Sequence, residues 1–241
     1  MGHLLQAAIA AHGGLDRWNS YRKVSLDLSV GGALWDFKGQ TGLFRDAHYE
    51  AELNAQRAIL GRFGGPDQRV RFSPNKLVLE TASGEPIESR DNPREAFKGH
   101  QSDTPWDRLH AAYFDGYALW TYLTQPFLYS YPGFETIEIE PWEEDGHTWR
   151  RLAVTFPDTN ANHNAEQVFY YDEQFMQRRM DYSPDVTGNP PIAQYTFDAE
   201  TFDGFVFPTR RLVHRHDANG VADQSVAVIT VDVRSVAVEQ G

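Results

Sequence analysis

The stretch PWDRLHAAYFDGYALWTY, residues 105–122, decides how the rest of the chain is interpreted. Its bulky side chains recur at spacings of three and four, the period of an α-helix, and Pro105 fits the first helical position after a Thr104 N-cap. The recurring residues are Trp106, Leu109, Tyr113, Tyr117 and Trp120. An enclosed aromatic ring buries roughly 150–250 Å², so this helix cannot lie in solvent. We expect a helix over residues 105–123 that other parts of the chain cover.

Strand patterns flank this helix on both sides in the sequence. Apolar residues alternate with polar ones over residues 24–30, and the pair Gly31-Gly32 predicts a hairpin to a second strand at residues 33–38. Similar runs, separated by Gly, Pro, Asn and Asp, continue to the end of the chain. We predict a mainly β fold: a strongly curved antiparallel sheet of about 11 strands, an incomplete β-barrel, whose concave face the aromatic helix covers. Residues 1–18 are predicted to open the chain as helix.

The composition is that of an acidic folded protein. The 241 residues include 22 Lys and Arg against 34 Asp and Glu, a formal net charge of −12. We therefore exclude nucleic-acid binding, which needs a basic surface. No apolar run approaches the roughly 18 residues that suggest a membrane span. We expect one domain over residues 1–241 in the cytoplasm, exported only if a signal peptide has been removed ahead of residue 1, and the oligomeric state is left open.

Three stretches together resemble the lipoprotein-localisation-factor-like (LolA/LppX-like) superfamily of periplasmic lipoprotein carriers and their uncharacterised relatives. They are AHGGLDRW at residues 11–18, the β-meander after it, and FPTRR at residues 207–211. The resemblance implies an incomplete barrel that wraps around helices and encloses an apolar cavity for acyl chains. No signal peptide is evident here, which is a departure from the carriers. The resemblance is therefore used for the fold and its chamber rather than for lipoprotein transport.

The high aromatic content, 13% of residues, suits a chamber for a planar or lipid-like molecule. The predicted ligand-binding residues are Trp106, Tyr113, Trp120, Tyr195 and Arg210. The leading hypothesis is a soluble binding protein for an apolar or aromatic small molecule held between sheet and helix. The plainer alternative is that the same rings simply fill the interior.

A second hypothesis is a cofactor-independent lyase, isomerase or cyclase that uses the same chamber. His110 follows Asp107 by one helical turn, and as an imidazole it could transfer protons together with Tyr117. Arg179 would stabilise an oxyanion or enolate. The predicted catalytic residues are thus His110, Tyr117 and Arg179. The plainer interpretation of His110 is a partly buried side chain that hydrogen-bonds the backbone.

Two arginine pairs, Arg178-Arg179 and Arg210-Arg211, lie on predicted strands. Neighbouring strand residues point to opposite faces, so one arginine of each pair should face inward. An inward cation is costly unless it meets an acidic side chain or an anionic ligand. Asp181, two residues after Arg179, is the acidic partner in the structural interpretation. In the functional interpretation, the acidic partner is a carboxylate or phenolate of a bound ligand.

Metal and cofactor signals are weak throughout the sequence. His214 and His216 have the spacing of two ligands on one strand face, but no spacing specifies a third ligand and both lie beside the polar turn at residues 217–220. A solvated strand end explains them. Cysteine is absent, and no nucleotide-binding fingerprint follows a predicted strand. We predict no metal site and no cofactor.

Overall fold

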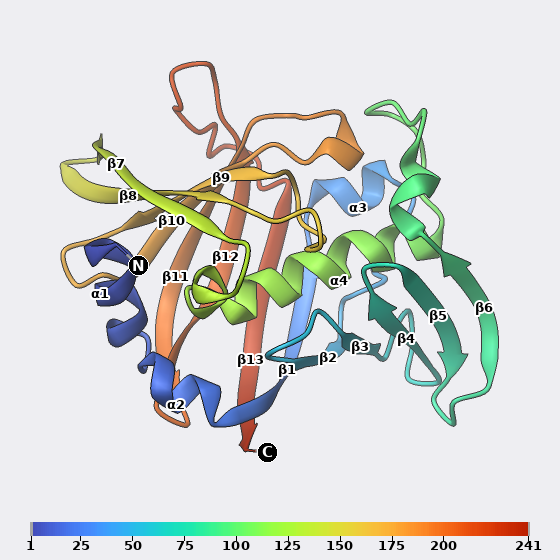
Figure 1. The fold of residues 1–241 in the computed structure, drawn as a ribbon. Helices are drawn as coiled ribbons and strands as arrows, with labels where there is room; N and C mark the ends of the chain where they lie inside the picture. The colour runs from blue at the N-terminus through green and yellow to red at the C-terminus, as the bar shows by residue number, and fades with distance from the viewer. Residues whose placement is uncertain (1, 241) are drawn as a thin grey trace.

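The computed structural model describes residues 2–240, which form one large antiparallel sheet crossed by a long helix (Figure 1). The sheet has 13 strands in the order β6-β5-β4-β3-β2-β1-β13-β12-β11-β10-β9-β8-β7. Strands β1 to β6 and β7 to β12 are two meanders, and the last strand, β13, lies between β1 and β12. The C-terminal strand therefore joins the two halves of the sheet.

The helices are α1 (His3–Ala11), α2 (Leu15–Asn19), α3 (Ala33–Phe37) and α4 (Arg108–Thr124), with 3₁₀ turns η1 (Pro93–Phe97), η2 (Phe127–Ser130) and η3 (Asp185–Thr187). The first-half strands are β1 (Tyr21–Gly31), β2 (Ala47–Glu52), β3 (Ala58–Gly61), β4 (Gln68–Ser73), β5 (Lys76–Thr81) and β6 (Pro86–Asp91). The remaining strands are β7 (Glu135–Glu144), β8 (His147–Thr155), β9 (Glu166–Tyr171), β10 (Gln177–Tyr182), β11 (Ile192–Phe202), β12 (Phe205–Arg215) and β13 (Ile229–Gln240). The predicted mainly β fold, with a curved open sheet and a covering helix, is confirmed.

The predicted strand at residues 33–38 is wrong, because the chain forms helix α3 there. The glycine pair makes no hairpin: β1 pairs with β13 and β2. Gly32 has φ +106°, and a Cβ on it would lie 2.6 Å from the Val228 carbonyl oxygen. Gly32 thus allows the backbone to pass close to the segment before β13. The Leu34 N–H donates to the Val228 carbonyl of that segment at 3.0 Å.

Helix α4 begins later than predicted. Asp107, and not Thr104, is its N-cap: the Asp107 carboxylate accepts from His110 N–H at 2.8 Å, and Asp107 N–H donates to His110 Nδ1 at 3.3 Å. The Thr104 hydroxyl is already engaged as the acceptor for Gln101 N–H. Sequence alone could not separate the two caps, because both residue types are favoured at this position.

Helix α4 is buried on all sides, since every residue from Leu109 to Thr124 is buried. The sheet curls around it, so that β3, β4 and β5 contact the helix as well as the central strands. Gly116 permits the closest approach: a Cβ there would lie 2.6 Å from the Phe72 ring on β4. On the same helix surface the Tyr49 hydroxyl donates to the Gly116 carbonyl at 2.7 Å.

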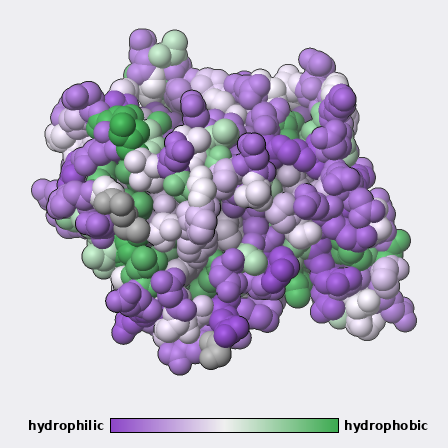
Figure 2. All heavy atoms as spheres, viewed as in Figure 1, coloured by the Kyte–Doolittle hydropathy of each residue, from purple (hydrophilic) through white to green (hydrophobic). Residues whose placement is uncertain are grey.

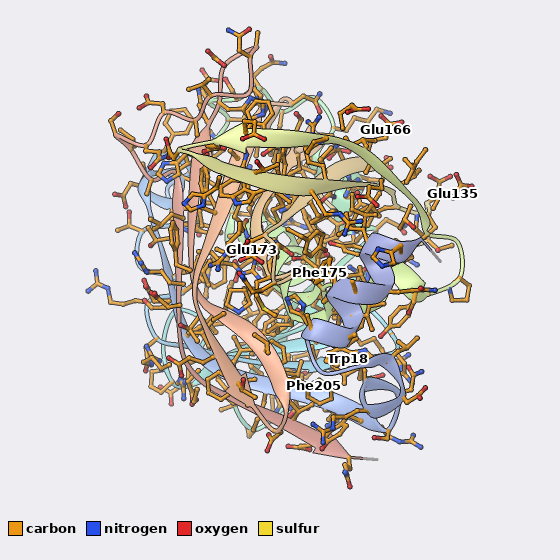
Figure 3. The ribbon with its side chains drawn as sticks, turned by 90° about the vertical axis from the view of Figure 1, so that its left-hand side faces the viewer. Trp18, Glu135, Glu166, Glu173, Phe175 and Phe205 are labelled. Atoms are coloured by element: carbon orange, nitrogen blue, oxygen red, sulfur yellow. The ribbon has the colours of Figure 1, made fainter. Side chains whose placement is uncertain are left out.

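The N-terminal helices close one side of this core. Trp18 of α2 stacks on Phe127 with ring centroids 4.2 Å apart and meets the edge of Phe205 at the start of β12 (Figure 3). The helical region predicted over residues 1–18 is present and divides between α1 and α2 at Gly13-Gly14. Hydrophobic residues also gather on the surface over this side, around α1, α2 and β7, whereas the rest of that face is mainly hydrophilic (Figure 2). Within residues 2–240, no helix is long and apolar enough to cross a membrane.

The Gly116 contact predicts that Gly116→Ala destabilises the protein. In an ordinary helix interior this change stabilises by roughly 0.5–1 kcal/mol, so the expected sign is reversed. Chemical denaturation of the variant should show a lower free energy of unfolding. The double variant Gly116→Ala with Phe72→Leu relieves the clash and should cost less than the sum of the two single changes. An alanine variant as stable as the parent would contradict the close approach.

Candidate functional site

A row of polar side chains crosses the concave face on four neighbouring strands. Tyr171 on β9 pairs with Gln177 on β10, and Thr196 on β11 pairs with Arg211 on β12. The Thr196 hydroxyl donates to the Gln177 carbonyl at 2.5 Å and links the two pairs. All four residues are buried. The row therefore lies inside the protein, where polar groups normally have partners.

Arg211 is the charged member of this row. Its Nη2 donates to the Tyr122 carbonyl near the C-terminus of α4 at 3.1 Å, and its guanidinium lies 4.7 Å from the centre of the Tyr122 ring. Four residues after Tyr122 the chain has Pro126, which has no N–H, so this carbonyl has no intrahelical partner. Burial lowers the pKa of Arg211 to about 10, and the side chain stays cationic at neutral pH.

Several polar atoms around Arg211 make no hydrogen bond to any residue between 2 and 240. They are Gln125 Oε1, the Tyr129 and Tyr171 hydroxyls, Gln177 Nε2, Gln194 Nε2 and Arg211 Nη1. The residues come from β9 to β12 and from the segment after α4. The Gln125 side-chain amide donates to the Met180 sulfur, and Met180 pairs with Gln194 on the neighbouring strand. An unsatisfied buried group costs about 1–3 kcal/mol. Such a concentration is typical of a surface that meets solvent or a ligand rather than of a closed core.

A neutral histidine network lies beside the polar row. His163 Nδ1 is 3.3 Å from the Tyr117 hydroxyl, and its Nε2 is 3.0 Å from that of Tyr122. The His163 ring stacks on Tyr182, whose hydroxyl donates to Gln194 at 3.2 Å. Burial, reinforced by the positive charge of Arg94, lowers the pKa of His163 to about 3. The imidazole is therefore neutral near pH 7 and a weak base.

Two small cavities border the packed interior, one between α4 and the sheet and one between α3, the segment around η3 and the sheet. One of about 20 Å³ is bordered by Arg211, Tyr122 and apolar residues of α4, β1, β12 and β13. The other, of about 50 Å³, lies near Phe114, Tyr182 and Val213. Ligand pockets commonly measure roughly 300–1,000 Å³, so the chamber expected from the sequence is largely filled. Aromatic rings of the helix and of the sheet interdigitate here. In this conformation the rings fill most of the interior, as the plainer alternative from the sequence expected.

A third space lies on the outside. A groove of about 260 Å³ runs along α3 and the segment before β13, lined mainly by apolar side chains together with Arg215 and Asp223. Four residues line both this outer groove and the 50 Å³ inner cavity: Leu34, Phe37, Arg215 and Val228. The two spaces therefore adjoin.

The architecture can now be compared with known proteins. No family model and no curated protein matches the sequence. Among solved structures, a LolA superfamily protein from Nitrosomonas europaea is 10% identical with a TM-score of 0.51 over 97% of this chain and 91% of that one. A DUF1329 family protein from Desulfovibrio piger is 11% identical, with a TM-score of 0.53 over 97% and 91%. A putative outer membrane lipoprotein-sorting protein domain from Vibrio parahaemolyticus is 10% identical, with a TM-score of 0.56 over 99% and 92%.

The chain has a LolA-like fold. The resemblance noticed in the sequence is thus confirmed as a likeness of fold. At these identities the likeness extends to architecture, and function has to come from the site itself.

Three of the predicted ligand-binding residues lie on or just before α4, inside the LolA-like fold. Trp106 is buried among aromatic rings, including those of Trp35 and Phe97. The Tyr113 hydroxyl is 3.5 Å from an Arg94 nitrogen, and the Trp120 indole N–H donates to the Glu52 carbonyl at 2.8 Å. All three are buried, and none of them borders the 20 Å³ or 50 Å³ cavity.

Arg179, Tyr195 and Arg210 lie on the opposite, convex side of the sheet. Arg179 is fully buried there in ion pairs of 2.7 Å with Glu144 and Asp181, the acidic partner that the sequence suggested. Burial acts to lower the pKa of Arg179, but its bonds to Asp181 outweigh this and raise it. Tyr195 joins the cluster, and Arg210 forms a half-exposed ion pair with Asp198 at 2.8 Å.

The remaining predicted residues have structural partners. His110 caps α4 as described, and its Nε2 contacts the Ala96 carbonyl at 3.1 Å, in line with the plainer interpretation of this residue. Tyr117 does reach the interior network through His163. The His214 and His216 imidazoles each contact a backbone carbonyl, and no group of three potential ligands is arranged for a metal among residues 2–240.

The residues that the structure brings together here were mostly not predicted. His163 and Gln194 were not predicted for this interior network, because a loop histidine and a strand glutamine are ordinary surface residues in sequence. Arg211 was named only as one of a pair. Arg211 is separated by even numbers of residues from Phe205, Phe207 and Val213, so strand alternation puts it on the same face as these buried side chains. This was the one available signal that it faces inward.

Asp115 provides a test of the interior electrostatics. This carboxyl is buried on α4, and burial raises its pKa to about 8. The folded state therefore holds a proton that the unfolded state releases near pH 4, so stability falls as pH rises from about 4 to 8, by about 1.4 kcal/mol per pH unit. Asp115→Asn should be the more stable protein at pH 7, with an advantage that grows between pH 5 and pH 8. Urea unfolding at several pH values measures it, and a pH-independent difference would contradict the buried carboxyl.

Proposed function

We propose that this protein binds an apolar or amphipathic small molecule, which enters through the outer groove and occupies the concave face beneath α4. The observation that carries the proposal is the continuity of the outer groove with the inner cavity through Leu34, Phe37, Arg215 and Val228. Val213, two residues from Arg211 on the same face of β12, lines the inner cavity. An enlarged cavity would therefore extend toward the interior groups that have no protein partner.

Exposed apolar side chains at the groove support an apolar ligand. Phe37 is 57% exposed and Val226 is 54% exposed, and both line the groove. Large exposed apolar residues that cluster at a concavity mark binding surfaces more often than isolated ones do. Arg215 at the same groove adds a cation for an amphipathic molecule.

Binding requires the inner space to enlarge. A ligand that binds an opened form better than the packed form shifts the population toward the opened form. Tyr182 links the two regions, because it lines the inner cavity and its hydroxyl donates to Gln194 in the polar interior. The Vibrio structure with the same fold, named a putative outer membrane lipoprotein-sorting protein domain, supports an apolar ligand for this chain.

The catalytic alternative and the cytoplasmic location stay predictions from the sequence. His163, which lies beside the cavity-lining rings of Phe114 and Tyr182, has too low a pKa to act as a base near pH 7. No other observation favours a reaction over binding.

The uncharged dye Nile red tests the proposed function. It should bind with a fluorescence increase, and Phe37→Ser should weaken its affinity several-fold because the groove loses an exposed apolar ring. Ile137→Ser is the matched control: Ile137 is 66% exposed on the edge strand β7, far along the sheet from the groove. Equal affinity in the parent and the Phe37 variant, or an equal loss in the control, would exclude the groove as the entrance.

A further inference from the structure

Arg211 and Arg179 are two deeply buried arginines with opposite surroundings. Arg179, on the convex side, has carboxylate partners in Glu144 and Asp181 and a third bond of 2.7 Å to the Gly220 carbonyl. Among residues 2–240, no carboxylate forms an ion pair with Arg211, and the ionisable groups that influence it most are the hydroxyls of three tyrosines. The protein thus neutralises one buried guanidinium and leaves the other without a counter-charge.

The tyrosines around Arg211 cannot supply that counter-charge. Burial raises the pKa of Tyr122, Tyr129 and Tyr182, so all three remain neutral phenols at physiological pH. The Tyr122 carbonyl accepts from Nη2 but adds only a dipole. A water molecule could satisfy the bare Nη1 as a hydrogen-bond acceptor, but it could not balance the charge.

The cavity beside Arg211 has the composition of an amphiphile site. Apart from Arg211 and Tyr122 its walls are apolar, with Leu119 and Leu123 from α4 facing Phe207 and Val231 from the sheet. Its volume of about 20 Å³ suits one small polar group next to the guanidinium. Toward the groove, Val213 and Arg215 follow on the same side of β12 and line the inner cavity. Four residues of strand from Arg215 to Arg211 span roughly 13 Å, the path of an extended chain.

We propose that the ligand is a fatty-acid-like amphiphile whose carboxylate binds Arg211 while its apolar chain runs along β12 toward the outer groove. This inference rests on the proposed function and specifies its ligand class. A carboxylate fits the planar fork of the guanidinium and balances its charge. It is also smaller than a phosphate or sulfate group, in keeping with the small space beside Arg211.

Displacement of Nile red by laurate and by dodecanol, which share one tail length, tests the ligand class. At a pH where laurate is ionised, the parent protein should bind laurate at least about tenfold more tightly than dodecanol, because a charge-assisted bond contributes about 1.5–3 kcal/mol. Arg211→Met should abolish this preference and leave dodecanol binding nearly unchanged. Arg210→Met is the matched control, since Arg210 is the next residue on β12 but faces solvent beside Asp198, and it should keep the parental preference.

The outcomes separate the two proposals. Equal binding of laurate and dodecanol by the parent, or an unchanged preference in Arg211→Met, would overturn the carboxylate site while dye binding upheld the proposed function. Failure of the parent to bind Nile red and both amphiphiles would overturn both. Should Arg211→Met not fold, because Arg211 also holds the end of α4, Arg211→Lys replaces it. The retained charge should keep the preference for laurate, and loss of that preference would count against the site.

Discussion

The need to cover an aromatic helix on every side governs this structure. Helix α4 presents large apolar side chains around its whole circumference, so a flat sheet on one side would leave much of it in water. A long antiparallel meander that curls past the helix solves this problem, and β13 closes it by joining the two halves. Gly116 and the Tyr49 bond to its carbonyl set how closely the wall approaches. The same close approach removes most of the chamber that such a half-barrel could otherwise enclose.

The polar interior stands out against this packing. Full burial of a large apolar side chain contributes about 1.5–3 kcal/mol, and each unsatisfied buried polar group costs about 1–3 kcal/mol. Each bare group beneath the end of α4 therefore cancels roughly the contribution of one buried ring. These groups lie on one side of the helix and on consecutive strands, whereas β1 contributes only apolar side chains, Val24 to Val30, to its inward face.

The sequence predicted the architecture well because its signals are local. Alternation over residues 24–30 and the three-four repeat after residue 105 depend only on which side chains must leave water. The errors at residues 33–38 and at the helix start have a different origin: Gly32 and Asp107 act through contacts with distant or alternative partners. The site was harder still, since the alternation of a strand shows that Arg210 and Arg211 face opposite ways but does not say which face is concave. Tertiary curvature decides that, and it assigned the interior to Arg211 and the convex ion-pair cluster to Arg179.

The two tasks of Arg211 are compatible with each other. Because Pro126 has no N–H, the Tyr122 carbonyl depends on a donor from outside the helix, and Arg211 Nη2 provides it. A guanidinium has five N–H groups in a rigid fork, so one carbonyl occupies only part of its donor capacity. Nη1 remains free to bind an anion without releasing the helix. An anion that binds Nη1 in the folded state alone would balance the buried guanidinium charge and would therefore stabilise that state.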